Sequence, residues 1–332
     1  MHIRRKKGWE MPEREATPER VFMNRREFMK SAGVWSLGAG VVLTGLDDAF
    51  EVAGLFGGPK KVGKEDLIRI PRTPTSHLYP ARRNAAFTLE RELTEELVAA
   101  RYNNFYEFSS KKNVWEHVNA FPARPWAVEV AGLVKRPATY DMDELVRKVP
   151  LEERLYRFRC VEAWAMAVPW TGFPMRELVK MVEPLSSSKY IRLQTLHNKD
   201  LFPAQKLRFW LPWPYEEGLT MEEATNELTL LATGIYGHEL PAQHGSPIRL
   251  IVPWKYGYKS IKSIVRMEFT EERPRTFWNT LVPEEYDFTS NVNPEVPHPR
   301  WSQATERMLG TDEIRKTVKY NDYGEYVARL YK

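Results

Sequence analysis

The segment Arg157-Phe158-Arg159-Cys160-Val161-Glu162-Ala163-Trp164 contains the only cysteine of the chain. Its first half alternates apolar and basic residues and is typical of a strand that runs directly into Cys160. The thiol would then lie beside two arginines and a tryptophan. Because nearby positive charge lowers the pKa of a thiol, we expect a thiolate that binds a metal or attacks an electrophile. A buried cysteine that packs as a small apolar side chain is the alternative.

A single cysteine in 332 residues also limits the class of protein. It excludes an intramolecular disulfide framework and any zinc or iron–sulfur site that needs several cysteine ligands. A thiolate bound to a soft metal would need its other ligands from elsewhere, and an exogenous sulfur-bearing cofactor would supply them. A nucleophilic cysteine would need a histidine base, but no spacing marks one among the seven histidines.

A second segment, Pro247 to Lys262, places Arg249 and three lysines among aromatic residues and a glycine turn. Backbone N–H groups and charged ends in such a segment can bind an anion. A solvated basic loop is the alternative. A third segment, Asn103 to Phe108, is a polar–aromatic loop that by itself predicts no more than packing.

The pattern of the remaining chain predicts an α+β fold rich in β-structure, with mixed sheets and long loops. The evidence is a series of alternating or apolar runs for strands and short amphipathic runs for helices. We see no internal repeat, and we expect irregular structure from Pro274 onward. The expected strands are 126–134, 156–159, 190–196, 248–253 and 263–269; the expected helices begin at Thr94 and span 141–149, 175–181 and 221–224.

The first 53 residues have the features of an export signal. Arg25-Arg26, then Phe28 and Lys30, precede an uncharged run from Ser31 to Leu46, which is too short for a typical transmembrane span. Paired arginines before a weakly apolar run resemble a twin-arginine signal, which predicts a periplasmic protein exported by that machinery. A general secretory signal, an amphipathic helix and an uncleaved anchor are the alternatives. We therefore divide the chain into a signal (1–53), an approach segment (54–90) and one domain (91–332).

The net charge of +5 comes almost entirely from this leader. Residues 1–30 contain nine basic and five acidic residues, which leaves about +1 for the rest of the chain. A general nucleic-acid-binding protein needs a basic face on its folded domain, so we expect no nucleic-acid partner.

Taken together, the three segments resemble the molybdopterin-dependent fold of the sulfite oxidases. Two further stretches, Asn291 to Pro294 and His298 to Glu306, narrow the resemblance to the catalytic subunits of periplasmic protein-methionine-sulfoxide reductases. The similarity covers roughly residues 90–330, and several long motifs recur in order. It implies a single molybdopterin-binding domain that carries one Mo-molybdopterin.

The resemblance also implies the residues of the site. Cys160 matches the family's molybdenum ligand, which makes it the catalytic residue and a ligand rather than a nucleophile. His244 stands where some members have Asn, and Ser260 stands where some relatives have Gly. Trp164, Trp170 and Trp254 are candidates for an apolar rim or for the core. The implied cofactor contacts are Asn103, Tyr106, Glu107, Cys160, Thr195, His244, Arg249, Ser260, Ile261 and Lys262.

The activity that the resemblance implies is reduction of methionine sulfoxide in oxidised periplasmic proteins. The chain has neither Cys-x-x-Cys-His nor Gly-x-Gly-x-x-Gly, so electrons must come from outside; in this family the donor is a haem-binding membrane subunit. Three alternatives remain: sulfite oxidation on the same fold, a non-catalytic periplasmic binding protein, and a hydrolase or transferase with a cysteine nucleophile.

Overall fold

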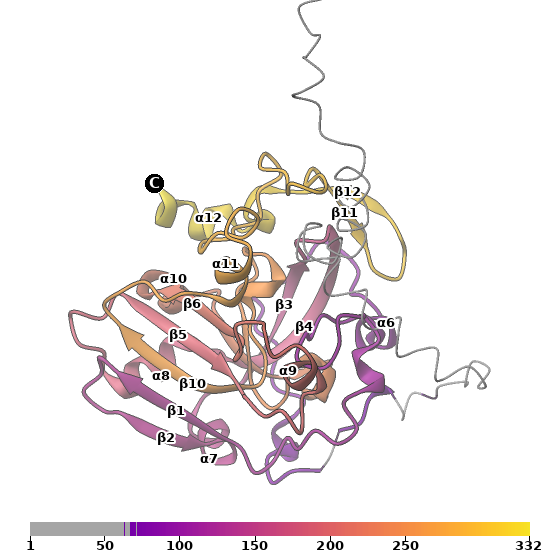
Figure 1. Cartoon of the computed structure of the whole chain (residues 1–332). Helices are drawn as coiled ribbons and strands as arrows, with labels where there is room; N and C mark the ends of the chain where they lie inside the picture. Colours follow the sequence, from indigo (N-terminus) through magenta and orange to yellow (C-terminus); the bar gives the residue numbers. More distant parts are fainter. Residues whose placement is uncertain (1–62, 64–66, 71) are drawn as a thin grey trace, which may run out of the picture. The chain divides into compact units, whose positions relative to one another are not determined.

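The computed structural model describes residues 63, 67–70 and 72–332 (Figure 1). The chain divides into two compact units, Met1–Phe56 and Gly57–Lys332, and every described residue belongs to the second. The signal expected at 1–53 therefore lies outside the described residues, and the domain boundaries stay a prediction. Among the residues that are described, none of the helices is long and apolar enough to span a bilayer.

One of two sheets has five strands in the order β2-β1-β10-β5-β6. The pair β1–β10 is parallel and the other pairs are antiparallel. Figure 1 shows β1, β10, β5 and β6 side by side, with β2 next to β1. Their bounds are β1 Ala127–Gly132, β2 Ala138–Asp141, β5 Tyr190–Thr195, β6 Glu216–Thr220 and β10 Ile264–Thr270.

The other sheet has seven strands and is built around β4 and β7. Its path is β12-β11-β4-β7-β8, while β3 pairs with β4 and β9 pairs with β7. The bounds are β3 Glu152–Arg159, β4 Trp164–Pro174, β7 Leu230–Ile235, β8 His238–Glu239, β9 Arg249–Ile251, β11 Thr305–Met308 and β12 Ile314–Lys316.

Short helices join the strands, and two of them show why they begin where they do. The side chain of Asp141 accepts hydrogen bonds from the backbone N–H groups of Asp143 and Glu144 and caps α7. Thr220 and Glu223 form a capping box at α10. The helices are α6 Glu96–Arg101, α7 Met142–Lys148, α8 Met175–Val182, α9 Pro203–Leu207, α10 Met221–Thr225, α11 Phe277–Leu281 and α12 Gly324–Val327.

The alternating and amphipathic segments identified in the sequence are confirmed as β1, β3, β5, β9, β10, α7, α8 and α10. The sequence missed β4, all eleven residues of which are buried. A strand covered on both faces has no alternation, and Pro169 and Gly172 inside it resemble loop residues. Gly172 is required here, since a Cβ would lie 2.2 Å from the carbonyl oxygen of Leu231 on β7.

The expected helix start with Thr94 as its N-cap is wrong. The residue before α6 is Glu95, and the Thr94 hydroxyl instead accepts a hydrogen bond from the backbone N–H of Ala167 on β4. Residue 94 is therefore fixed to the seven-stranded sheet rather than to the helix that follows it.

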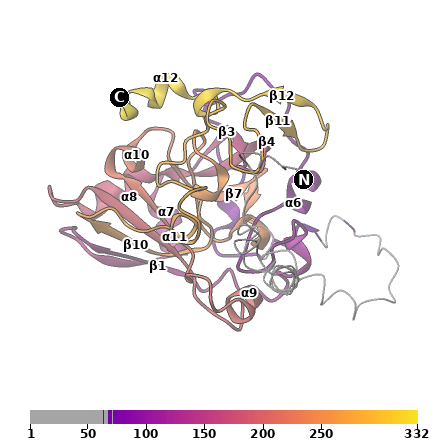
Figure 2. The same cartoon turned by 45° about the horizontal axis from the view of Figure 1, so that its top comes forward.

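The tail from Pro274 is more regular than expected, because it contains α11, β11, β12 and α12. In Figures 1 and 2 the yellow C-terminal part of this tail runs along one side of the fold, next to β3 and β4. The parallel pairing of β11 with Trp164 and Ala165 of β4 brings the tail next to the Cys160 segment.

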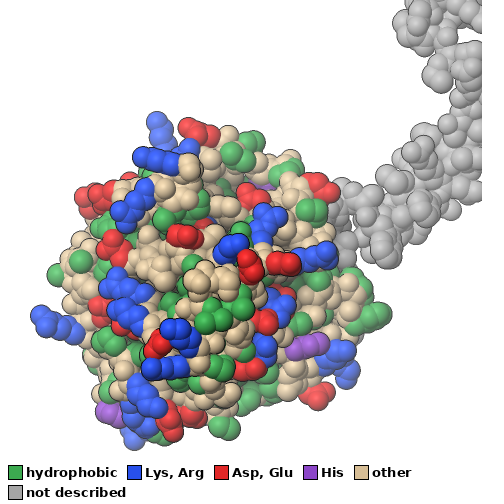
Figure 3. Space-filling model, turned by 90° about the vertical axis from the view of Figure 1, so that its left-hand side faces the viewer, with side chains coloured by type: hydrophobic (Ala, Val, Ile, Leu, Met, Phe, Trp, Pro, Cys, Tyr) green, Lys and Arg blue, Asp and Glu red, His purple; other side chains and the backbone are tan. Residues whose placement is uncertain are grey.

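On the face shown in Figure 3, basic and acidic side chains are interspersed with apolar ones. The distribution matches the nearly balanced charge of the chain after its first 30 residues.

Candidate functional site

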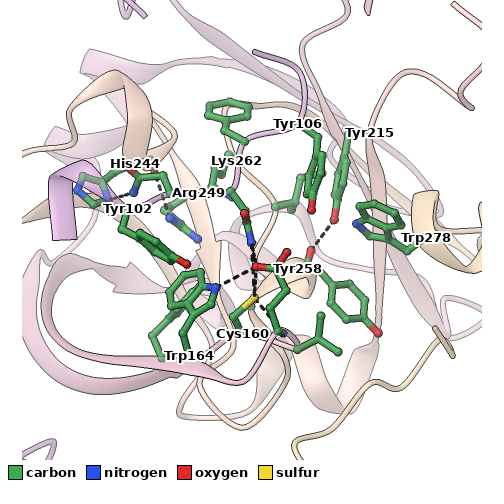
Figure 4. Close-up of a pocket in the computed structure, with 18 of the residues that line it drawn as sticks. Tyr102, Tyr106, Cys160, Trp164, Tyr215, His244, Arg249, Tyr258, Lys262 and Trp278 are labelled. Carbon is green, nitrogen blue, oxygen red and sulfur yellow. Dashed lines mark hydrogen bonds between the residues drawn. The ribbon is translucent and has the colours of Figure 1, made fainter. Parts of the chain in front are cut away.

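A cavity lies where loops from both sheets meet, and Cys160 is in its wall (Figure 4). Residues from the loop before β1, the β3–β4 turn, β9 and the segment before β10 line it. The structure thus brings together eight of the ten sequence-predicted residues: Asn103, Tyr106, Glu107, Cys160, His244, Arg249, Ile261 and Lys262.

Cys160 occupies a tight turn between β3 and β4. Its backbone N–H donates to the carbonyl of Trp164 (2.9 Å), and its carbonyl accepts from Ala163 (3.1 Å). Ala163 has a φ of +63°, an uncommon backbone conformation for a residue with a Cβ. The N–H of Glu162 points at Cys160 Sγ (3.4 Å). The turn therefore directs the sulfur into the cavity.

The expected lowering of the thiol pKa is wrong for the protein alone. Burial, and next the carboxylate of Glu162, raise the pKa of Cys160 to about 12. The arginines do not compensate, because side chains alternate along β3: Phe158 and Cys160 line the cavity, whereas Arg157 pairs with Asp322 and Arg159 with Glu306. A further positive charge directly beside the sulfur would favour the thiolate.

Glu162 is the acidic group closest to the sulfur. Burial alone would raise its pKa, but Lys112 outweighs this and lowers it, with further help from Trp164 and Asn104. Lys112 Nζ lies 2.6 Å from the carboxylate, the Trp164 indole N–H donates to it at 3.0 Å, and Asn104 donates at 3.1 Å. The carboxylate is therefore held ionised and fixed next to Cys160.

The C-terminal tail fixes the Cys160 turn from behind. Gln303 donates to the carbonyl of Val161 (2.6 Å) and accepts from the buried guanidinium of Arg159 (2.9 Å). The Trp301 indole N–H donates to the same Val161 carbonyl (2.7 Å). Arg159 also donates to the carbonyl of Cys160 and pairs with Glu306. The Val161 carbonyl is thus held by Trp301 and Gln303, and the Cys160 carbonyl by Arg159, which Gln303 and Glu306 hold in turn.

A cationic region lies elsewhere in the wall. Arg249 donates to the carbonyls of His244 (2.9 Å) and Ser260 (3.1 Å), and its Nε has no partner although it is buried. Burial lowers the pKa of Arg249 to about 9. Burial, and next Arg249, lower the pKa of His244 to about 3, so the imidazole is neutral. Asn103 lies within 3.4 Å of His244 Nδ1, and its Oδ1 is buried without a partner.

Lys262 and Glu107 also face the cavity, and each shifts toward its neutral form. Burial, and next Arg249, lower the pKa of Lys262 to about 7, while burial raises the pKa of Glu107 to about 7. Neither Arg249 nor Lys262 forms an ion pair with a described residue. Both cations therefore face a cavity in which an anionic ligand would offset their burial.

Thr195 and Ser260 do not line the cavity but support residues that do. The Thr195 hydroxyl donates to the carbonyl of Lys262 (2.8 Å). Ser260 accepts from the backbone N–H of Val252 (3.3 Å), and its carbonyl accepts from Arg249. Their direct contact with a cofactor stays a prediction.

The three tryptophans of the candidate rim have different positions. Trp164 lines the cavity, but Trp170 and Trp254 are completely buried and belong to the core. The rim is instead completed by aromatic residues that the sequence did not single out, namely Tyr102, Tyr215, Tyr258, Trp278 and Tyr286. Asn104 and Glu162 belong to the motifs quoted from the sequence, so they could have been predicted as site residues. Trp278 and Tyr286 lie outside those motifs, and no sequence pattern marks them as site residues.

The comparisons with known proteins agree with this geometry. Residues 116–278 match the family model described as "Oxidoreductase molybdopterin binding domain". The "Protein-methionine-sulfoxide reductase catalytic subunit MsrP" of Burkholderia mallei is 43% identical over 98% of this chain and 94% of its own length. The protein of the same name from Ralstonia nicotianae is 42% identical over 98% of this chain and 95% of its own length. The chain belongs to this family.

The predicted family and the predicted fold class, an α+β molybdopterin-binding domain, are therefore confirmed. Among solved structures, the sulfane dehydrogenase SoxCD of Paracoccus pantotrophus matches with a TM-score of 0.44 and 14% identity, over 80% of this chain and 63% of that one.

The residues present fit a molybdenum–pterin group. Its phosphate would neutralise Arg249 and Lys262, which have no ion-pair partner among the described residues, and a polar ring edge would satisfy the buried Asn103 Oδ1. A metal cation beside the sulfur would offset the raised pKa of Cys160. At Gly257 a Cβ would lie 2.7 Å from the Phe158 ring, so glycine lets the segment 257–262 approach the cavity wall.

Proposed function

We propose that this protein reduces methionine sulfoxide in oxidised periplasmic proteins, using a molybdenum–pterin cofactor bound through Cys160. Family membership supports the reaction, since the relatives named above are protein-methionine-sulfoxide reductase catalytic subunits. The convergence of Cys160 with Arg249, Lys262 and Asn103 on one cavity supports the cofactor.

One observation favours sulfoxide over sulfite as the substrate. The cavity lining includes the aromatic residues Tyr102, Tyr106, Trp164 and Trp278, and the carboxylate of Glu162 lies 3.7 Å from the Cys160 sulfur. The ammonium group of Lys112 is paired with this carboxylate. A sulfite dianion would meet a carboxylate there, whereas a neutral sulfoxide with an apolar thioether side chain suits aromatic walls.

In this mechanism the molybdenum centre, when bound, supplies two-electron transfer of an oxygen atom. The overall reaction consumes two electrons and two protons per sulfoxide and gives methionine and water. Cys160 would hold the metal, and Arg249, Lys262 and Asn103 would hold the pterin phosphate and ring. Tyr106 and Trp278, whose rings meet edge to face at 5.0 Å, would exclude water and position the methionine side chain.

Electron supply and location are the further parts of the proposal. The name "catalytic subunit" of the relatives suggests a partner, and we propose a haem-binding membrane subunit as the electron donor. The twin-arginine pattern at Arg25-Arg26 supports export to the periplasm by the twin-arginine machinery.

The test is to assay protein matured in its own host with a dithionite-reduced dye. We expect dye oxidation with methionine sulfoxide and no oxidation of sulfite when an electron acceptor is supplied instead. Sulfite oxidation without sulfoxide reduction would refute the proposed function and leave the cofactor assignment standing. Protein without molybdenum and without either activity would refute both.

A further inference from the structure

Three large apolar side chains lie together on the surface at the end of α9. Leu207 is 55% exposed, Phe209 73% and Trp210 48%, and the two aromatic rings meet at 5.4 Å. Figure 2 shows α9 at the lower edge of the fold. We call Leu207, Phe209 and Trp210 the aromatic patch. Contiguous exposed apolar groups of this kind typically mark a binding surface.

The segment that carries the aromatic patch is bonded to the wall of the cavity. The buried guanidinium of Arg208, within the patch segment, donates to Ser110 in the loop that carries Glu107, and Ala204 of α9 donates to the Glu107 carbonyl (3.0 Å). Five residues beyond Trp210 the chain reaches Tyr215, which lines the cavity. Five residues span at most about 18 Å, so the patch lies within that distance of the cavity wall.

A row of aromatic contacts follows the same route. Trp213 contacts Phe277 (5.0 Å between centroids), Phe277 contacts Trp278 (5.4 Å), and Trp278 contacts Tyr106 of the cavity wall (5.0 Å). Trp213 also donates its indole N–H to the carbonyl of Arg208, directly before Phe209. Phe277 and Trp278 are buried, so these contacts run through the packed interior and hold the patch at a fixed separation from the cavity wall.

This arrangement fits an extended polypeptide as the occupant. A group that fills the cavity and touches the patch must span up to about 18 Å, which an extended chain does in about five residues. Methionine is mostly buried among apolar residues in folded proteins. When such a segment is locally unfolded, its sulfoxide and its apolar neighbours become accessible together.

We propose that the aromatic patch binds apolar residues about four to six positions away from the methionine sulfoxide in an unfolded segment of the substrate protein. The inference rests on the proposed function and extends it to the class of substrate. The patch contributes to the binding of polypeptides and leaves the reduction of free methionine sulfoxide unaffected.

The test compares the wild-type holoenzyme with a Phe209→Ser/Trp210→Ser variant on three substrates. These are free methionine sulfoxide, a peptide with one sulfoxide flanked at the fifth positions by Leu-Phe pairs, and the same peptide with Ser in their place. Leu185→Ser is the control variant. Leu185 is exposed and lies shortly before Tyr190, which is the opposite end of β5 from Thr195. Anisotropy of the labelled peptides measures binding without turnover.

For the double variant we expect KM and Kd to rise about tenfold with the Leu-Phe peptide, the loss of one good anchor. Values for the Ser peptide and for free methionine sulfoxide, and every value for Leu185→Ser, should stay unchanged. Unchanged binding of the Leu-Phe peptide by the double variant would overturn the inference. A double variant that loses only its binding to anionic lipid vesicles would also overturn it, because the patch would then contact a membrane. A wild-type enzyme that is inactive on every substrate would refute the proposed function. The anisotropy measurement would still show whether the aromatic patch binds the peptide.

Discussion

Replacement of Gln303 by Leu tests how the Cys160 turn is held. Gln303 is almost completely buried, donates to the Val161 carbonyl and accepts from Arg159. Leucine has a similar volume but makes neither hydrogen bond. The bond to the charged Arg159 contributes about 1.5–3 kcal/mol and the neutral one about 0.5–1.5 kcal/mol. The Val161 carbonyl keeps the hydrogen bond from Trp301, and the Arg159 guanidinium keeps its ion pair with Glu306. We therefore expect the free energy of unfolding to fall by about 2–4 kcal/mol.

The assay is urea unfolding followed by circular dichroism, with the midpoint shifting and the slope unchanged. Gln194→Leu is the control, since Gln194 is a half-buried glutamine on β5; it should change stability by less than about 0.5 kcal/mol. Because Gln303 sits behind Cys160, the variant should also show an altered spectrum of the bound molybdenum.

A Gln303→Leu protein that matches wild type within about 0.5 kcal/mol and has an unaltered metal spectrum would refute the reasoning. It would mean that the hydrogen bond donated by Trp301 and the Arg159–Glu306 ion pair suffice to fix the turn.

Three further predictions concern the site and its support. Cys160→Ser should remain folded by circular dichroism and lose sulfoxide-dependent dye oxidation; measurable turnover would sink the ligand assignment. Lys262→Gln should retain less molybdenum after desalting, because a cation that faces the cavity is removed; equal metal content in wild type and variant would contradict that role. Lys259→Met should lower the free energy of unfolding by about 3–5 kcal/mol, because Glu217, 2.6 Å from Lys259 Nζ and fully buried, loses its partner. A urea midpoint equal to that of wild type would show that Glu217 is satisfied without it.

Local patterns predicted the strands and helices whose periodicity is visible in the sequence. The strands β5 and β10 alternate because one face is more buried than the other, and α7 begins at Asp141 because its carboxylate caps the first turn. The buried strand β4 has no such alternation, so its eleven residues gave no period to detect.

The site was predictable only where a motif carried it. The segments around Cys160 and Arg249 stood out by residue type, the resemblance to a known family added the Asn103 loop, and the structure brings all three to one cavity. The charge around Cys160 was misjudged because neighbours in sequence alternate between the two faces of β3. Trp278, from the tail, reaches the cavity through tertiary packing that no local pattern reports.

The account rests most directly on the claim that Cys160 holds molybdenum in this cavity. X-ray absorption at the molybdenum edge, measured on wild type and on Cys160→Ser matured in the same host, tests it. We predict that the variant retains the metal through the pterin contacts and loses one sulfur from its coordination. Identical sulfur coordination in the two proteins would contradict the claim.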